Sequence, residues 1–178
     1  EAALAAATGL SDGEVRAALA ELVAGDWAGR HEAGALTTIY PFSTVPTTVR
    51  LHLAGGDGAE RYAPCAIDAL GVAPMLGRVV GVASACPVCG AAIALTVAPD
   101  GVRDRDPATL AVLHRRTAGP AHLLRCGATR FVCSPEHGRA WIAAQGGPDD
   151  DLLLPDAAFA RARGLFGAAY REGRIGDG

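Results

Sequence analysis

The stretch Tyr62-Ala-Pro-Cys65-Ala-Ile-Asp68-Ala-Leu70 is the most informative part of this chain of 178 residues. It is rich in helix formers and carries Pro64 near its start, which predicts a helix over residues 63–70. Cys65 and Asp68 stand three positions apart, so they would share one face of a helical turn. A thiol binds soft metals and a carboxyl group can carry a proton. The pair therefore indicates chemistry on a thiophilic metal. An alternative stays open, in which Cys65 is a small buried hydrophobic residue and Asp68 is an acid on the helix surface.

The remainder of the chain after residue 57 alternates short strands with helices, which predicts an α+β fold. We expect a mostly antiparallel sheet flanked by helices. The predicted strands are residues 78–85, 91–98, 110–115 and 130–133, and the predicted helices are residues 136–145 and 156–171.

The N-terminal part, residues 1–56, is predicted to form a small winged-helix-like domain ahead of a main domain over residues 57–178. Ser11 and Glu14 have the spacing of a capping box, which starts the second of two short helices. Residues 36–40 and 47–53 are rich in β-branched side chains and would pair as a hairpin. The glycine-rich segment 54–58 then indicates a turn or linker between the two domains.

Charge and composition argue against several classes of protein. The net charge is -3, and residues 1–50 hold three Arg against six Asp and Glu, so no basic patch for nucleic acid is present. No apolar run reaches the ~18 residues of a membrane span. No signal peptide is visible, although the chain begins at Glu1 rather than Met. Five cysteines, an odd number, indicate reduced thiols in a cytoplasmic protein rather than a disulfide framework.

The segment around Cys65 resembles the organomercurial (alkylmercury) lyase family, which carries a Cys-Ala-x-Asp-x-Leu motif followed by Pro, Gly and Arg. The motif stands here as Cys65-Ala-Ile-Asp68-Ala-Leu70, with Pro74, Gly77 and Arg78 after it. The N-terminal winged-helix-like region is also similar to the family's. Further similar features follow in family order up to about residue 170, namely Ser84-Ala-Cys86, Ile93-Ala-Leu-Thr-Val97, Cys126, Phe131-Val-Cys-Ser134 and Trp141.

The resemblance implies a lyase of mercury resistance that cleaves carbon–mercury bonds by protonolysis. Cys65 and Cys126 would bind the organomercurial substrate as thiolates, and Asp68 would move the proton. Mercury(II) would stay on the two sulfurs until small thiols or a mercuric reductase accept it, and catalysis would require no cofactor. The chemistry agrees, because mercury(II) is soft and prefers thiolates. A second thiolate also makes the metal-bound carbon more basic, which favours its protonation.

Cysteines that the family pattern does not demand suggest a second metal site. Cys86-Pro-Val-Cys89-Gly90 has the form of a zinc knuckle, in which a tight glycine turn aims two sulfurs at one point. Cys133 and His137 would complete a structural Cys₃His zinc site. Two alternatives stay open. In the first, Cys86 is a buried core thiol, Cys89 and Cys133 are incidental and His137 lies on the surface. In the second, these sulfurs relay mercury to or from the main pair.

Two other functions also stay open. The winged-helix outline suits a metal-responsive regulator, although an acidic N-terminal region argues against contact with DNA phosphates. A zinc-stabilised metal-binding module without catalysis is the other, and in it Cys65 and Asp68 would be dispensable.

Overall fold

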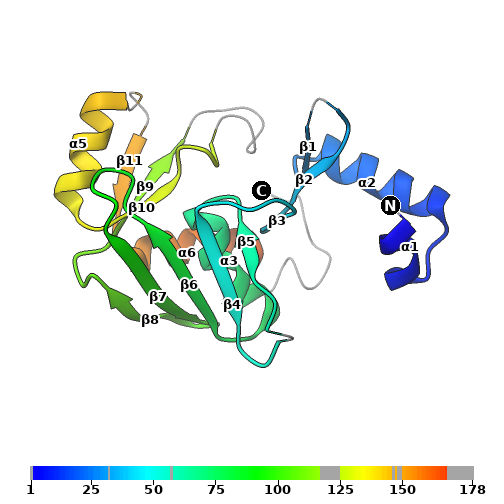
Figure 1. Cartoon of the computed structure of the whole chain (residues 1–178), viewed down its shortest axis with the longest axis horizontal. Coiled ribbons are helices and arrows are strands. Elements are labelled where there is room, and N and C mark those ends of the chain that lie inside the picture. Colours follow the sequence, from blue (N-terminus) through cyan, green and yellow to red (C-terminus); the bar gives the residue numbers. More distant parts are fainter. Residues whose placement is uncertain are drawn as a thin grey trace.

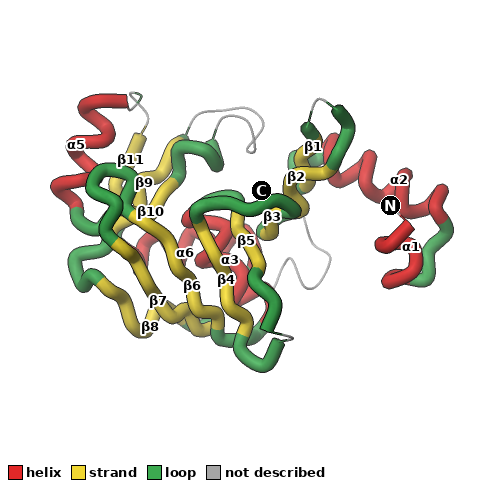
Figure 2. The backbone as a smooth tube through the Cα atoms, viewed as in Figure 1, coloured by secondary structure: helices red, strands yellow, loops and turns green. Residues whose placement is uncertain are grey.

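The computed structural model describes residues 2–31, 33–56, 58–116, 125–145, 147 and 150–167. These residues form an α+β fold in which two sheets and two central helices share one core (Figures 1 and 2). Every strand pair that the structure describes is antiparallel. The α+β class and the mostly antiparallel sheet, both predicted from the sequence, are confirmed.

The larger sheet has eight strands in the order β1-β2-β3-β5-β4-β6-β7-β8, and the smaller has three in the order β10-β9-β11. The strands of the larger sheet are β1 (Ala28–Arg30), β2 (Leu36–Ile39), β3 (Phe42–Ser43), β4 (Val49–Leu53), β5 (Arg61–Ala63), β6 (Val80–Ala85), β7 (Ala92–Ala98) and β8 (Gly101–Asp106). Those of the smaller sheet are β9 (Ala111–Arg115), β10 (Arg130–Val132) and β11 (Asp150–Leu153). The helices are α1 (Ala2–Thr8), α2 (Asp12–Ala24), α3 (Ala66–Leu76), α5 (Pro135–Gln145) and α6 (Pro155–Phe166).

Helix α3 is the centre of the core. Its apolar residues run all the way around the helix, and ten of its eleven residues are buried. A helix of this kind must be covered on every side. It contacts β4, β5, β6 and β7 of the larger sheet, β10 of the smaller sheet and helix α6. Full burial of a side chain such as Leu70 or Val72 contributes about 1.5–3 kcal/mol, so α3 supplies much of the stability of the fold.

The ends of α3 differ from the prediction of residues 63–70. The helix begins at Ala66, because Ala63 is still the last residue of β5. It ends at Leu76, where Gly77 follows as the C-cap in a left-handed conformation with φ of 66°. Gly71 and Pro74 have poor intrinsic helix propensity, yet both lie inside the helix and both are buried. Tertiary packing therefore outweighs local propensity in the second half of α3.

Most other predicted elements are confirmed within one or two residues. The strands predicted at 78–85, 91–98, 110–115 and 130–133 are β6, β7, β9 and β10, and the helix predicted at 136–145 is α5. The helix predicted at 156–171 is α6, which ends at Phe166 because Gly167 leaves the helical conformation. Residues 168–171 lie outside the described part of the chain.

The N-terminal helices form as predicted, but the hairpin prediction is wrong. The capping box is present, with the Ser11 N–H donating to Glu14 Oε2 at 2.8 Å. Strands β3 and β5 lie between β2 and β4, which were expected to pair. Strand β4 pairs instead with β5 and β6, because its alternation of buried Val49 and Leu51 with exposed neighbours suits the main core. The larger sheet therefore continues across the predicted domain boundary at residue 56.

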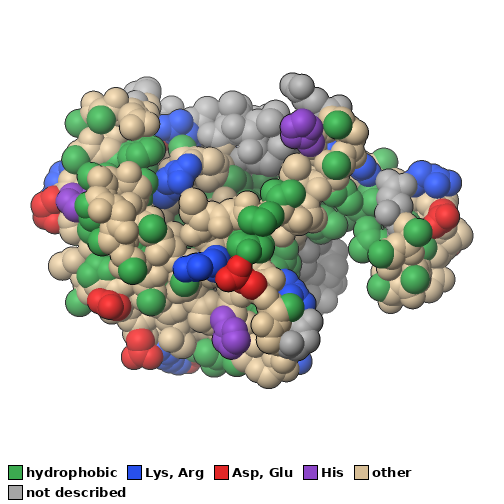
Figure 3. Space-filling model, in the orientation of Figure 1, with side chains coloured by type: hydrophobic (Ala, Val, Ile, Leu, Met, Phe, Trp, Pro, Cys, Tyr) green, Lys and Arg blue, Asp and Glu red, His purple; other side chains and the backbone are tan. Residues whose placement is uncertain are grey.

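The surface and the helix lengths add two observations. On the face shown in Figure 3, acidic and basic side chains are scattered singly instead of gathering in one patch. None of the helices in the described residues combines the length and the apolar character that a membrane crossing requires.

The packing of α3 on α6 generates a stability prediction. A Cβ added at Gly71 would overlap the ring of Phe166, with the ring Cγ only 2.9 Å away, and Phe166 is buried. We expect Gly71→Ala to destabilise the protein. Overpacking costs about 1–3 kcal/mol, which exceeds the gain of about 1 kcal/mol in helix propensity.

Gly164→Ala is the matched control, because Gly164 lies in α6 with no atom within 4 Å of the added Cβ. It should stabilise the protein by up to about 1 kcal/mol. Urea denaturation of both variants measures the two effects. Equal stabilisation by the two substitutions would contradict the close contact between α3 and α6.

Candidate active site

Cys65 and Asp68 lie together at the start of α3. Cys65 is the N-cap residue in extended conformation, and Asp68 is the third residue of the helix. The backbone N–H of Cys65 lies beside the Asp68 carboxyl group and favours its ionised form, while the Cys65 side chain makes no capping hydrogen bond. The Ala66 N–H donates to the carbonyl of Thr129 at 3.3 Å, which ties this turn to the segment that carries Cys126. Both side chains are about 5% exposed or less.

Cys126 reaches the same point from a turn that precedes β10. The Ala128 and Thr129 N–H groups donate to the carbonyl of Arg125 at 3.1 and 3.0 Å and close that turn. The Cys126 thiol donates to Asp68 Oδ2 at 3.6 Å. The two sulfurs and a carboxylate oxygen of Asp68 all lie within 4.8 Å of one another, and all three residues are buried. The fold thus brings together the three predicted residues, although Cys65 and Cys126 stand 61 positions apart in the sequence.

The spacing of the two sulfurs suits a shared ion. Their separation of at most 4.8 Å is about twice a metal–sulfur bond of ~2.3 Å, taking zinc–sulfur bonds as the yardstick. One soft cation can therefore contact Cys65 and Cys126 together while the carboxyl group of Asp68 stays beside it.

Tyr40 is a site residue that the sequence analysis missed. It follows β2 directly, is 5% exposed, and its hydroxyl oxygen lies 3.4 Å from Cys126 Sγ. Burial raises the pKa of Tyr40, so the phenol keeps its proton and can donate it in a hydrogen bond to a thiolate. A tyrosine before a proline in a strand carries no sequence signal for this role.

A cavity of about 240 Å³ opens beside the trio. Its apolar walls come from three distant parts of the chain, with Trp27 before β1, Ile67 in α3 and Phe166 at the end of α6. The Trp27 and Phe166 rings meet edge to face, with centroids 6.2 Å apart. His114 of β9 also lines the cavity, although its spacing in the sequence suggested no such place. A small apolar group next to the sulfurs would fit this space.

An ion pair forms part of the cavity wall. Arg125 Nη2 lies 3.1 Å from Asp26 Oδ2, and both side chains are partly exposed. Since Arg125 adjoins Cys126 and Asp26 adjoins Trp27, this contact holds the N-terminal segment against the turn that bears the second thiol. Both residues line the cavity.

Burial sets the protonation of Asp68 and Cys65. It raises the pKa of Asp68 to about 7, against the opposing effect of hydrogen bonds from Cys65 and Cys126. Burial also raises the pKa of Cys65 well above its usual value, and the nearby Cys126 and Asp68 add to that shift. Cys65 therefore keeps its proton near neutral pH, and the carboxyl group of Asp68 can both accept and release one there.

The other four predicted ligands form a second group. Cys86, Cys89, Cys133 and His137 offer ligand atoms that also lie within 4.8 Å of one another. The two groups share no residue, so the five cysteines divide into two and three as the sequence suggested.

Comparison with known proteins identifies the family of this chain. A family model described as alkylmercury lyase matches residues 42–167, which include Cys65, Asp68 and Cys126. Relatives described as alkylmercury lyases include one from Staphylococcus epidermidis, 35% identical over 136 residues that make up 75% of this chain and 60% of the relative. Another, from Bacillus cereus, is 33% identical over 125 residues, or 68% of this chain and 56% of the relative. The chain thus spans somewhat more than half the length of these relatives.

A solved structure, described as the mercury-bound form of MerB2, has the same fold. Its TM-score is 0.74 at 21% identity, over 92% of this chain and 79% of that one. Because the family model spans most of the chain and the relatives agree with it, this chain belongs to the alkylmercury lyase family.

Proposed function

We propose that the chain is an organomercurial lyase, which cleaves the carbon–mercury bond of alkyl- or arylmercury compounds to a hydrocarbon and mercury(II). The observation that carries the proposal is the convergence of two buried thiols and one buried carboxyl group beside an apolar cavity. The thiols of Cys65 and Cys126 bind the metal, the carboxyl group of Asp68 handles the proton, and the cavity receives the organic group.

Substrate binding uses the affinity of mercury for sulfur. The thiol of Cys65 or Cys126 binds the organomercury cation and loses its proton, which Asp68 can accept. The second thiol then binds the same mercury, since the two sulfurs lie close enough to share it. A second thiolate pushes electron density toward the carbon, which becomes more basic.

Protonolysis follows from this arrangement. Asp68 delivers a proton to the carbon, and the electron pair of the carbon–mercury bond becomes the new carbon–hydrogen bond. Mercury remains divalent on two sulfurs, and one of the two thiol protons is left for solvent, so the reaction involves no oxidation or reduction. Holding the reacting groups in place can lower the barrier by up to ~7–11 kcal/mol. A carboxyl group with a pKa of about 7 is well suited to accept and donate a proton near neutral pH.

The N-terminal segment would then serve as a cover. We infer that residues 57–178 carry the chemistry and that the part of residues 1–56 that precedes β4 closes the cavity. Asp26, Trp27 and Tyr40 support this inference, because they line the cavity next to Cys126. The ion pair between Asp26 and Arg125 would hold the cover in place.

The product would pass to another thiol. Mercury(II) on two thiolates exchanges with further thiolates, so small thiols or a mercuric reductase are the proposed acceptors. All five cysteines are free thiols, which supports a reducing, cytoplasmic location. The excess of Asp and Glu over Arg in residues 1–50 supports the proposal that the protein does not bind nucleic acid.

A headspace assay tests the activity. With excess thiol, the protein should release methane from methylmercury and benzene from phenylmercury, detected by gas chromatography. Cys65→Ser and Cys126→Ser should release no hydrocarbon above background, because a hydroxyl group is a poor ligand for mercury. Asp68→Asn should slow release by about 10²–10⁴-fold, the usual loss when a positioned acid is removed.

Asp156→Asn is the matched control for Asp68→Asn. Asp156 also lies in the first turn of a helix but is exposed, so its substitution should leave hydrocarbon release unchanged. Full activity of a folded Cys65→Ser or Cys126→Ser variant would refute the proposed mechanism.

The protonation of Asp68 generates a separate prediction on stability. In the unfolded chain this carboxyl group ionises near the ordinary aspartate pKa of 3.8, whereas in the native protein burial raises its pKa to about 7. Between these values the unfolded chain binds fewer protons, so rising pH favours unfolding. Wild type should therefore lose stability relative to Asp68→Asn between pH 4 and 8, by a loss on the order of 4 kcal/mol at most.

Urea denaturation of wild type and Asp68→Asn at pH 5 and pH 8 measures this loss. Asp156→Asn should follow wild type at both pH values. A difference between wild type and Asp68→Asn that does not change with pH would show that Asp68 ionises normally in the native protein.

A further inference from the structure

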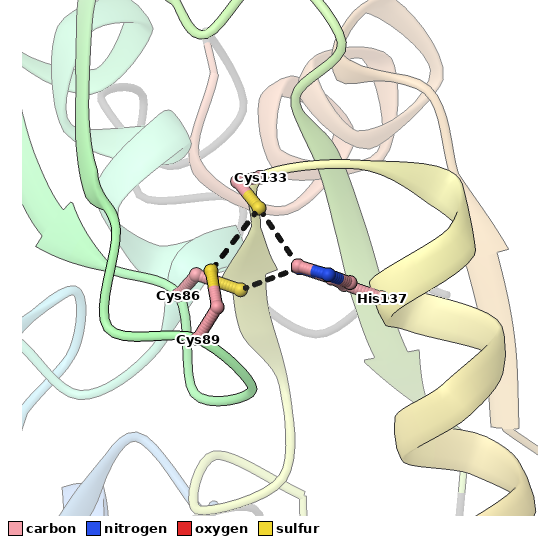
Figure 4. Close-up of side chains that lie close together, drawn as sticks. All are labelled: Cys86, Cys89, Cys133 and His137. Atoms are coloured by element: carbon pink, nitrogen blue, oxygen red, sulfur yellow. Dashed lines mark hydrogen bonds between the residues drawn. The ribbon is translucent and has the colours of Figure 1, made fainter.

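A second cluster of ligand atoms lies apart from the trio that the proposed reaction uses. Figure 4 shows the side chains of Cys86, Cys89, Cys133 and His137 pointing toward one common point. The ligand atoms are at most 4.8 Å apart. Cys86 is buried, Cys133 and His137 are partly buried, and Cys89 is exposed, so the cluster lies at the edge of the core. Three sulfurs and one imidazole nitrogen make up a ligand set typical of structural zinc.

The first two ligands come from a tight turn between β6 and β7. The Cys86 N–H donates to the Ala91 carbonyl at 2.9 Å, and the Gly90 N–H donates to the Cys86 carbonyl at 2.8 Å. Gly90 has φ of 74°, in the left-handed region that favours glycine. The turn thus presents both sulfurs on the same side, toward Cys133 and His137.

The other two ligands come from the start of α5. Cys133 follows β10 directly, and His137 lies four residues later in the first turn of the helix. The Thr109 hydroxyl group donates to the Cys133 carbonyl at 2.7 Å, and the Ser134 hydroxyl oxygen accepts from the His137 N–H at 3.3 Å. These contacts hold the backbone so that Cys133 Sγ and His137 Nδ1 face the same point, 3.0 Å apart.

The distances among the ligand atoms fit a tetrahedron around one ion. With zinc–sulfur bonds of ~2.3 Å and zinc–nitrogen bonds of ~2.0 Å, tetrahedral edges are about 3.8 Å between two sulfurs and about 3.5 Å between sulfur and nitrogen. Cys89 Sγ and Cys133 Sγ are 3.7 Å apart, and Cys86 Sγ and His137 Nδ1 are 3.6 Å apart. Of these three distances, the contact of 3.0 Å between Cys133 Sγ and His137 Nδ1 must lengthen, by about 0.5 Å.

The same distances argue against a disulfide. A sulfur–sulfur bond is ~2.05 Å long, and the sulfurs of Cys89 and Cys133 are 3.7 Å apart. Four ligands from the protein would also leave no open position on a tetrahedral ion, which is the mark of a structural site and not a catalytic one.

We propose that Cys86, Cys89, Cys133 and His137 bind one Zn²⁺ ion that joins the two sheets of this protein. The ion needs three thiolates and a neutral imidazole, so its binding releases the thiol protons. It links the turn between β6 and β7 in the larger sheet to the junction of β10 and α5 beside the smaller sheet. Since Cys126 lies on the segment that leads into β10, the ion would also steady the strand next to the proposed active site.

Metal analysis tests the proposal directly. The protein is purified from cells supplied with zinc, with a thiol reductant and without a chelator. Inductively coupled plasma mass spectrometry should then find about one zinc ion per chain. Cys89→Ser and His137→Ala should reduce zinc to background. The double variant Cys65→Ser/Cys126→Ser should keep its full zinc content, because it changes the other group of thiols. Cobalt(II) in place of zinc should give the visible absorption of tetrahedral thiolate coordination, and Cys89→Ser should lose it.

A measurement on wild type covers the case in which the variants fail to fold. Removal of zinc by a chelator should lower the melting temperature, and added zinc should restore it in proportion to its concentration. The proposal would be overturned if the reduced protein neither contained nor took up zinc. It would also be overturned if Cys89→Ser and His137→Ala each kept the zinc of wild type, or if the four ligands retained mercury(II) but not zinc. None of these readouts depends on cleavage of an organomercurial, so the zinc site and the proposed function can fail separately.

Discussion

The burial of helix α3 on all of its sides is the constraint on which this structure depends. Two sheets and α6 enclose the helix, and its first turn carries Cys65 and Asp68 into the same apolar surroundings. A carboxyl group there loses most of its hydration, which raises its pKa to about 7. The interactions that stabilise the fold thus also give the carboxyl group the protonation behaviour that the proposed reaction requires.

Local signals in the sequence were sufficient to predict much of the fold. The capping box of Ser11 and Glu14, the glycine turn at Gly90 and the alternating apolar side chains of β6 and β7 each specify their own element. Local signals did not allow us to predict which strands pair when they are distant in the sequence. Strand β4 joins the main sheet because its buried face matches a core built largely from later residues, and no local pattern reveals that match. Strand β11 was missed as well, because an acidic start is not typical of a strand. Its first residue, Asp150, is stabilised by an ion pair with Arg115 at 2.7 Å, and the local sequence does not reveal that partner.

The candidate site was predicted more completely than the fold around it. Cys65, Asp68 and Cys126 were named from their chemistry and from a family motif, and they converge. Tyr40, Trp27 and Asp26 were missed because they act by position alone. They come from the N-terminal part of the chain, which the sequence analysis treated as a separate domain. The cavity exists only where that part meets α3 and α6, and such a meeting has no signature in a single sequence.

The two groups of thiols suggest that the protein has one site for mercury, a soft metal, and another for zinc, a borderline metal. Two buried sulfurs with a carboxyl group suit a mercury compound that passes through, whereas three sulfurs and an imidazole suit an ion that stays. X-ray absorption at the mercury edge, on zinc-loaded protein with one equivalent of mercury(II), tests this division most directly. We predict mercury bound by two sulfurs in wild type and by one in Cys126→Ser, with zinc retained in both. Mercury that displaces zinc, or that keeps the same sulfur ligands after Cys126→Ser, would contradict the account.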